Sequence, residues 1–200
     1  MNKPDVGVIF EESLPSEFFE DFESNVKAEG LNLVVESRKP LGLMACPEWF
    51  ILPVVVAFIG KSYFDGFLKE MGKDHYQSMK ESFSNLTNKV MCNPRIEPTL
   101  FGSQGKIITH NPFSLAFSIL AEAENGYTFK LLIPKSISGD NYGLIANRFM
   151  EFLSDYHLGL KTLESIGCVF EGQRPPSNII FVHYNSCSDS IEWLNEKDYR

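Results

Sequence analysis

Residues that bind metals or form disulfides are few in this sequence. Its 200 residues include four histidines and four cysteines, and the cysteines stand far apart, at Cys46, Cys92, Cys168 and Cys187. They form no C-x-x-C pair, and the histidines form no H-x-x-x-H or H-E-x-x-H motif. The pattern favours reduced, partly buried thiols and argues against a disulfide framework or a structural zinc site.

Long apolar runs are absent as well. The most apolar stretch, residues 49–59, has eleven residues, whereas a membrane-spanning helix needs roughly 20. The N-terminus, MNKPDVGVIFEE, has no apolar run of signal-peptide length. We therefore expect a cytoplasmic protein. We interpret residues 49–59 as a buried core helix, with insertion into a membrane or a partner's groove as the alternative.

Positive charge is in short supply. The chain carries 18 basic and 26 acidic residues, with a formal net charge of -8 and a pI near 5.0. Nucleic-acid binding requires clustered positive charge, so we expect no nucleic acid among the partners, whereas a basic protein is compatible. Hydrophobic residues at 44% and charged residues at 22% are typical of a folded domain.

Hydrophobic periodicity and turn signals predict the elements. Asn125-Gly126, between two apolar runs, is a strong hairpin signal because both residues tolerate positive φ. The expected strands are 6–10, 31–35, 106–109, 115–123, 127–133, 165–170 and 178–184. The expected helices are 16–30, 47–71, 76–90, a helix that starts at Ser138 or Asp140 and ends at Gly159, and a short terminal helix over 188–200.

This order of elements predicts the fold class. We expect a single α+β domain over residues 1–200, with a mixed, largely antiparallel sheet and helices on one face. Residues 38–94 are a candidate helical-pair insertion that stands away from the sheet.

Four sequence patterns are candidate sites of chemistry. FGSQGK at 101–106 contains two glycines and a lysine but lacks the Walker spacing, so a plain turn is favoured over a phosphate site. Solvated or hydrogen-bonded histidines are favoured over a zinc site of His110, His183 and Cys187, and no third residue orients Cys187 and His183 as a nucleophile pair. Glu122 and Glu124 share a strand face, which usually means a solvated face. We predict no catalytic residue, no metal site and no cofactor.

Acidic residues are concentrated near the N-terminus. Thirteen residues hold six acids and no lysine or arginine. One interpretation is a solubilising face, and the other is a docking surface for a positively charged protein, where opposite charge speeds encounter and fixes orientation. The predicted partner-binding residues are Glu11, Glu12, Glu17, Glu20, Asp21 and Glu23.

The stretch WFILPVVVAFIGKSYFDGFLKEMGKDHYQSMKESF, residues 49–83, resembles a segment found in small uncharacterised bacterial proteins. In those proteins an apolar helix leads through a G-K-x-x-x-x-x-F-like turn into an amphipathic helix. Many of them belong to bacterial conflict and immunity systems. The resemblance covers about a sixth of the chain and implies an interaction protein, with no site residue carried over.

Three functional hypotheses follow. The first is a non-enzymatic, cytosolic, immunity- or inhibitor-like protein that binds a basic protein partner, such as a toxin, through the acidic surface. The second is a defence-associated protein whose helical pair, 49–90, engages a membrane or oligomerises. The third is an enzyme that acts on a small substrate with carboxylates and His110 or His183.

Overall fold

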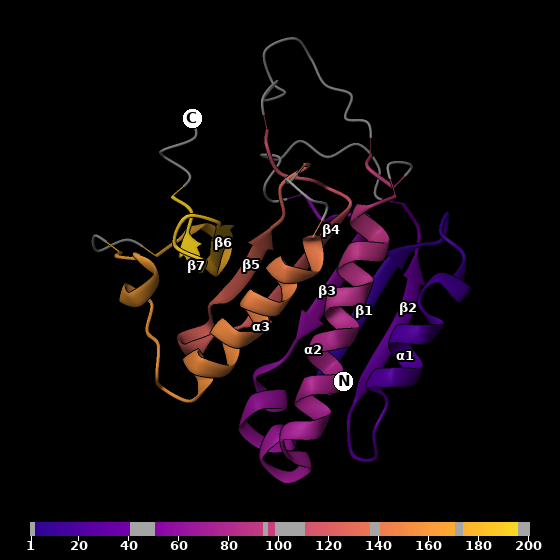
Figure 1. Cartoon of the computed structure of the whole chain (residues 1–200), viewed down its shortest axis with the longest axis horizontal. Helices are drawn as coiled ribbons and strands as arrows, with labels where there is room; N and C mark the ends of the chain where they lie inside the picture. Colours follow the sequence, from indigo (N-terminus) through magenta and orange to yellow (C-terminus); the bar gives the residue numbers. More distant parts are fainter. Residues whose placement is uncertain are drawn as a thin grey trace.

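The protein forms one mixed β-sheet with its α-helices on one face (Figure 1). The structure, a computed structural model, describes residues 3–40, 51–93, 96–98, 111–136, 141–170 and 174–195. The strands are β1 (Val6–Glu11), β2 (Leu33–Arg38), β3 (Val55–Ile59), β4 (Phe117–Glu122), β5 (Thr128–Leu132), β6 (Ile179–Asn185) and β7 (Ser190–Trp193). The helices are α1 (Glu20–Val26), α2 (Leu68–Met91) and α3 (Tyr142–His157).

The sheet consists of three parallel strand pairs placed side by side. Its order is β2-β1-β3-β4-β5-β6-β7. The pairs β1/β2, β3/β4 and β5/β6 are parallel, and their connections contain α1, α2 and α3 respectively, as parallel neighbours require a crossover. The contacts β1/β3, β4/β5 and β6/β7 are antiparallel. The predicted α+β class, mixed sheet and single helical face are confirmed, although parallel and antiparallel contacts are equally frequent in the described sheet.

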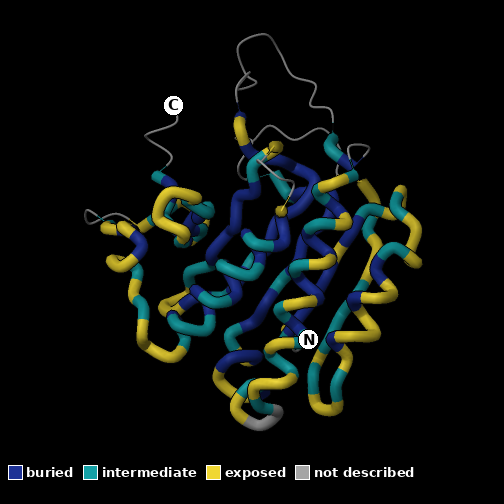
Figure 2. The backbone as a smooth tube through the Cα atoms, in the orientation of Figure 1, coloured by how far each residue is buried: buried dark blue, intermediate teal, exposed yellow. Residues whose placement is uncertain are grey.

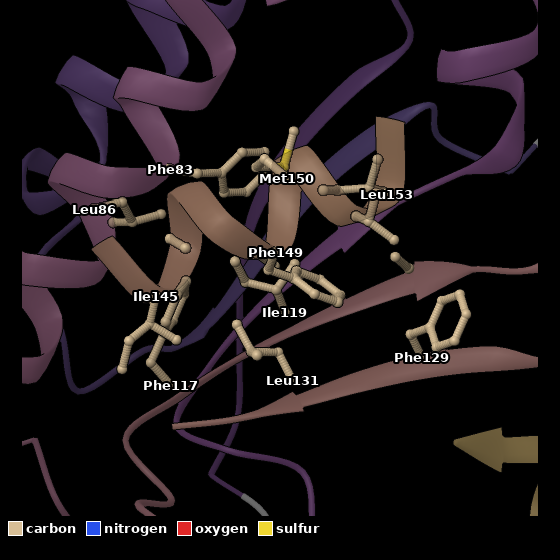
Figure 3. Packing of buried hydrophobic residues seen from close by; sticks show 14 of the residues in the cluster. Phe83, Leu86, Phe117, Ile119, Phe129, Leu131, Ile145, Phe149, Met150 and Leu153 are labelled. Atoms are coloured by element: carbon tan, nitrogen blue, oxygen red, sulfur yellow. The ribbon is translucent and has the colours of Figure 1, made fainter. Parts of the chain in front are cut away.

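The main core fills the space between the helices and one face of the sheet. Because side chains alternate along a strand, every second residue of β4 and β5 faces the helices. Figure 3 shows Ile119 and Leu131, which are directly paired across these strands, beneath Phe149 of α3. Phe83 and Leu86 come from α2, which lies beside α3 in the same helical layer, and they belong to the same cluster (Figure 3).

Two helices of this layer approach each other very closely. Gly143, in the first turn of α3, donates its backbone N–H to Asn88 Oδ1 of α2 at 2.7 Å. A Cβ atom at Gly143 would lie 2.2 Å from Ser84 Oγ and 3.1 Å from the Ser84 carbonyl oxygen. Only glycine therefore fits at this crossing without displacing α2.

The hairpin prediction is confirmed in detail. The turn between β4 and β5 places Asn125 at φ 58° and Gly126 at φ 76°. Both values lie in the left-handed region, where asparagine and glycine are favoured. The helix predicted over 76–90 is also confirmed within α2, and the kink at Gly72, at φ 78°, lies just before it.

The predicted helix over residues 47–71 is wrong for its apolar part. Residues 55–59 form β3, between β1 and β4, so a part of the predicted insertion range 38–94 lies inside the sheet. Val54, Val55 and Val56 follow Pro53, and β-branched side chains favour a pleated strand over a helix. The long helix of this region begins after β3, through a π-helical turn over Tyr63–Phe67.

Two predictions near the C-terminus are also wrong. Residues 165–170 do not form a strand: Glu164–Ile166 is a 3-10 turn. The terminal helix expected from residue 188 is instead β7, which pairs with β6. Ile191 and Leu194 are buried. The strand predicted at 106–109 lies outside the described residues.

Candidate protein-binding surface

Helix α1 separates apolar and acidic side chains on opposite sides. Phe19, Phe22 and Val26 are buried. The ring of Phe19 stacks on Phe10 of β1 at 4.0 Å, and Phe22 meets Phe83 of α2 edge-on at 5.0 Å. This apolar stripe anchors the short helix on the sheet and on α2, and the other residues of α1 are exposed (Figure 2).

The structure exposes most of the predicted partner-binding residues. Five of the six acids are exposed, and we call them the acidic surface: Glu12, Glu17, Glu20, Asp21 and Glu23. The sixth, Glu11, is half-buried, and its carboxylate lies 3.8 Å from the Arg38 guanidinium of β2. Glu11 therefore belongs to the fold more than to a docking surface.

Little of this negative charge is neutralised within the chain. In the described part of the protein, the only member of the acidic surface with an ion pair is Asp21, whose carboxylate lies 3.6 Å from Lys89 Nζ. That carboxylate is 88% exposed, and exposed pairs of this kind contribute about 1 kcal/mol at most. Glu12, Glu17, Glu20 and Glu23 keep their charge available to another molecule.

A groove of about 290 Å³ runs between α1 and α2 beside the acidic surface. Lys89 Nζ donates to the Phe18 carbonyl oxygen at 2.6 Å and lies 4.6 Å from the centre of the Phe18 ring. Phe18 is thus a half-buried aromatic next to the acids. No local pattern singles out Lys89, because its contacts join segments about 70 residues apart. The described lining residues are Phe18, Asp21, Phe22, Asn25, Ser82, Asn85, Leu86 and Lys89.

The carboxylates Glu122 and Glu124 are both engaged at the end of β4. Glu122 accepts hydrogen bonds from Lys3 Nζ at 2.6 Å and from the Lys61 backbone N–H at 3.0 Å. Burial opposes ionisation of Glu122, but these two donors outweigh it and lower the pKa of its carboxyl group. Glu124 pairs with Lys61 Nζ at 2.8 Å. These contacts tie the C-terminal end of β4 to Lys3 and Lys61. Both carboxylates are therefore engaged, and neither is free to act as a catalytic base.

The same end of the sheet holds a half-buried histidine. His157 stacks on Phe64 at 4.5 Å, and its Nε2 lies 3.1 Å from the Glu122 carbonyl oxygen, so Nε2 carries the proton. Its Nδ1 is buried and has no hydrogen-bond partner among the residues that the structure describes. Burial lowers the pKa of this imidazole, which is therefore a neutral structural group.

The residues considered for metal binding or nucleophilic chemistry are not assembled into a site in the described chain. His183 is half-buried on β6, where burial lowers its pKa, and Cys187 is exposed in the turn after it. No cluster of three or more metal-ligating side chains occurs among the described residues. His110, Cys46 and the FGSQGK segment lie outside them. Cys168 is buried, as expected, and burial raises the pKa of its thiol to about 12.

A second pocket, of about 400 Å³, lies at the opposite end of the sheet from Glu122, near the C-terminal end of α2. Its carboxylate, Glu97, accepts hydrogen bonds from Ser114 Oγ and from the Leu115 backbone N–H. Glu97 thereby holds the start of β4 and has a structural role. The described lining residues are Met91, Cys92, Asn93, Glu97, Ser114, Ala116, Lys135 and Tyr142.

Comparisons with known proteins indicate no function for this chain, so its surface is the source of the functional argument. Over the part of the chain that is described, no helix is both long enough and apolar enough to cross a bilayer. No family model matches the sequence, and no curated protein or solved structure is significantly similar to it.

Proposed function

We propose that this protein acts by contact, as a non-enzymatic, immunity- or inhibitor-like protein of the cytosol that binds a basic protein partner through the acidic surface. The observation that carries the proposal is the exposure of five carboxylates on the β1–α1 connection and α1, four of them without an ion pair in the described chain. The resemblance of residues 49–83 to proteins of bacterial conflict systems involves an apolar helix that is β3 in this structure, so the proposal rests on the acidic surface.

The physical role of such a surface is electrostatic steering. Complementary charge raises the rate of encounter and sets the orientation of the partner, with a smaller effect on the lifetime of the complex. The half-buried ring of Phe18, beside Asp21 at the α1–α2 groove, supplies an aromatic contact of the kind that contributes strongly to binding.

A matched pair of charge reversals tests the proposal. Glu17→Lys with Glu20→Lys changes the acidic surface, and Asp74→Lys with Glu164→Lys changes two exposed acids elsewhere. Both variants alter the net charge equally. Because Glu20 lies in the first turn of α1, where an acid stabilises the helix by about 0.3–1 kcal/mol, thermal denaturation of both variants is compared first.

Each tagged variant is then used to capture partners from cells that produce the protein, and association rates of the captured protein are measured at low and high salt. We expect the wild type and the Asp74/Glu164 variant to recover the same basic protein. The Glu17/Glu20 variant should associate at least about tenfold more slowly, with a weaker dependence on salt. Equal capture and equal rates for the two variants would show that the acids only solubilise the protein.

A further inference from the structure

The strand next to the acidic surface has an open edge. Among the described strands, β2 is the outermost of the sheet, and it pairs with β1 on one side only. It is six residues long and contains no proline, whereas β7, at the other edge, has four residues. Short strands and prolines are common protections of sheet edges, and β2 has neither.

The register shows which backbone groups face outward. β1 and β2 are parallel, and in a parallel pair the backbone groups of alternate residues point toward the neighbouring strand. The carbonyl oxygens of Asn32 and Arg38 accept hydrogen bonds from β1 and from Glu12, respectively. The residues of opposite parity, Val35 and Ser37, therefore direct their N–H and C=O groups away from the sheet.

These outward groups are unused within the described chain. There, no hydrogen bond engages the backbone N–H of Val35 or of Ser37. The neighbouring N–H of Leu33 is bonded to the Leu31 carbonyl oxygen at 3.1 Å, which ends the open row. An added strand would find donors and acceptors at Val35 and Ser37, in the spacing of a regular ladder.

The side chains around this edge set the chemistry of the strand that fits. Leu33 and Val35 lie on the helical face and are only partly buried, while Glu36 lies on the opposite face and is exposed. Residues 11–39 contain eight acidic and three basic side chains, which accounts for most of the net charge of -8. The edge is therefore suited to a segment that alternates apolar residues, beside Leu33 and Val35, with basic residues, beside Glu36.

We infer that the basic partner docks by adding an extended, alternating basic and apolar segment to the free edge of β2. Main-chain hydrogen bonds to Val35 and Ser37 hold the segment, and the surrounding acids select its charge. This inference rests on the proposed function, because the acidic surface supplies the attraction, and it specifies the part of the partner that is recognised.

The test uses synthetic peptides and the full-length protein. The probe is an eight-residue peptide that alternates lysine and valine. One control carries N-methyl groups on alternate residues, so that it has the same charge but cannot donate hydrogen bonds along one edge, and a second control replaces lysine by glutamate. Titrations are followed by two-dimensional NMR of the backbone amides. We expect shifts and slowed hydrogen exchange at Val35 and Ser37, and at least about tenfold weaker binding of both controls.

A substitution in β2 provides an independent measurement. Ser37→Pro removes a backbone N–H that points outward and leaves the hydrogen bonds between β2 and β1 intact. Edge strands tolerate proline at such a position. Ser37→Ala is the control, because it keeps the outward N–H. Ser37→Pro should weaken the lysine–valine peptide about tenfold, and Ser37→Ala should not. Equal binding of the N-methylated peptide, with shifts on α1 alone, would overturn the edge inference while the acidic surface remains a binding site. Binding that is unchanged by Glu17→Lys with Glu20→Lys would instead refute the proposed function.

Discussion

The closest contact between α2 and α3 makes Gly143→Ala the most informative single change in the fold. The added methyl group would lie 2.2 Å from Ser84 Oγ, 2.6 Å from Asn88 Nδ2 and 3.1 Å from the Ser84 carbonyl oxygen. The serine hydroxyl can rotate away, but the carbonyl oxygen belongs to the backbone of α2. Asn88 is held in place by the hydrogen bond that it accepts from the Gly143 N–H. The helices must therefore separate.

The expected cost follows from three terms. Overpacking of this kind costs typically 1–3 kcal/mol, and loss of the Asn88–Gly143 hydrogen bond costs about 0.5–1.5 kcal/mol. Alanine regains up to about 1 kcal/mol of helix propensity relative to glycine. The net expectation is a destabilisation of about 2 kcal/mol, which for a chain of this size lowers the melting temperature by roughly 4–8 °C.

Urea denaturation and thermal unfolding measure this difference. Gly66→Ala is the matched control, because a Cβ at Gly66 has no heavy atom within 4 Å, and its stability should change by less than about 1 kcal/mol. Combining Gly143→Ala with Ser84→Ala removes the nearest clashing atom, so the double variant should be more stable than the sum of the two single effects. If Gly143→Ala is as stable as the wild type, the helices do not cross this closely and the reasoning fails.

Three further predictions address the pH dependence, the hairpin and the C-terminal strands. Burial holds the pKa of His157 below its ordinary value, so the imidazole takes up a proton at a higher pH in the unfolded chain than in the folded one. The free energy of unfolding should therefore fall as the pH drops from about 7 toward 5. In urea titrations at several pH values, His157→Gln should flatten this dependence. Asn125 has a φ of 58°, in the left-handed region, where alanine is disfavoured and glycine is not. Asn125→Ala should therefore destabilise the protein by about 1 kcal/mol, whereas Asn125→Gly should not. Equal denaturation midpoints for the alanine and glycine variants would contradict this. Arg148 donates two hydrogen bonds to Asp189, so Arg148→Lys should lower the denaturation midpoint slightly at low salt and less at high salt, whereas a salt-independent loss would indicate a packing effect.

Local signals predicted those elements of the fold that depend on nearby residues. The turn at Asn125-Gly126 requires only two residues that accept positive φ, and it occurs where expected. The periodicity of residues 76–90 places one apolar face on the core, and α2 follows it. In both cases the local preference and the tertiary environment favour the same structure.

The apolar run before α2 shows where such reasoning fails. A short apolar run has no periodicity that separates a buried strand from a buried helix. The choice in favour of β3 depends on β1 and β4, which lie on either side of it and come from residues about 45 positions earlier and 60 later. The β-branched residues Val54, Val55 and Val56 were the available signal for a strand.

The candidate surface was predictable only in part for a similar reason. The six acids are visible as a local cluster, and five are exposed. The pairing of Glu11 with Arg38 requires β1 and β2 to be neighbours. The contact of Lys89 with Phe18 joins α2 to the chain before α1, and the open groups of Val35 follow from the strand order. None of these can be obtained from spacing along the chain.

The position of β3 also limits how the protein can act on other molecules. If the segment 49–90 were to insert into a membrane, β3 would have to leave both β1 and β4. β3 would lose its ladder hydrogen bonds to both neighbours, and the departure of the buried Val55, Val56 and Ile59 would leave a gap in the core. Removing several large buried side chains at once is comparable with the whole stability of an ordinary domain, about 5–15 kcal/mol. A function that preserves the folded sheet must therefore use groups that already face outward, and the carboxylates of the acidic surface and the edge of β2 meet that condition on neighbouring parts of the molecule.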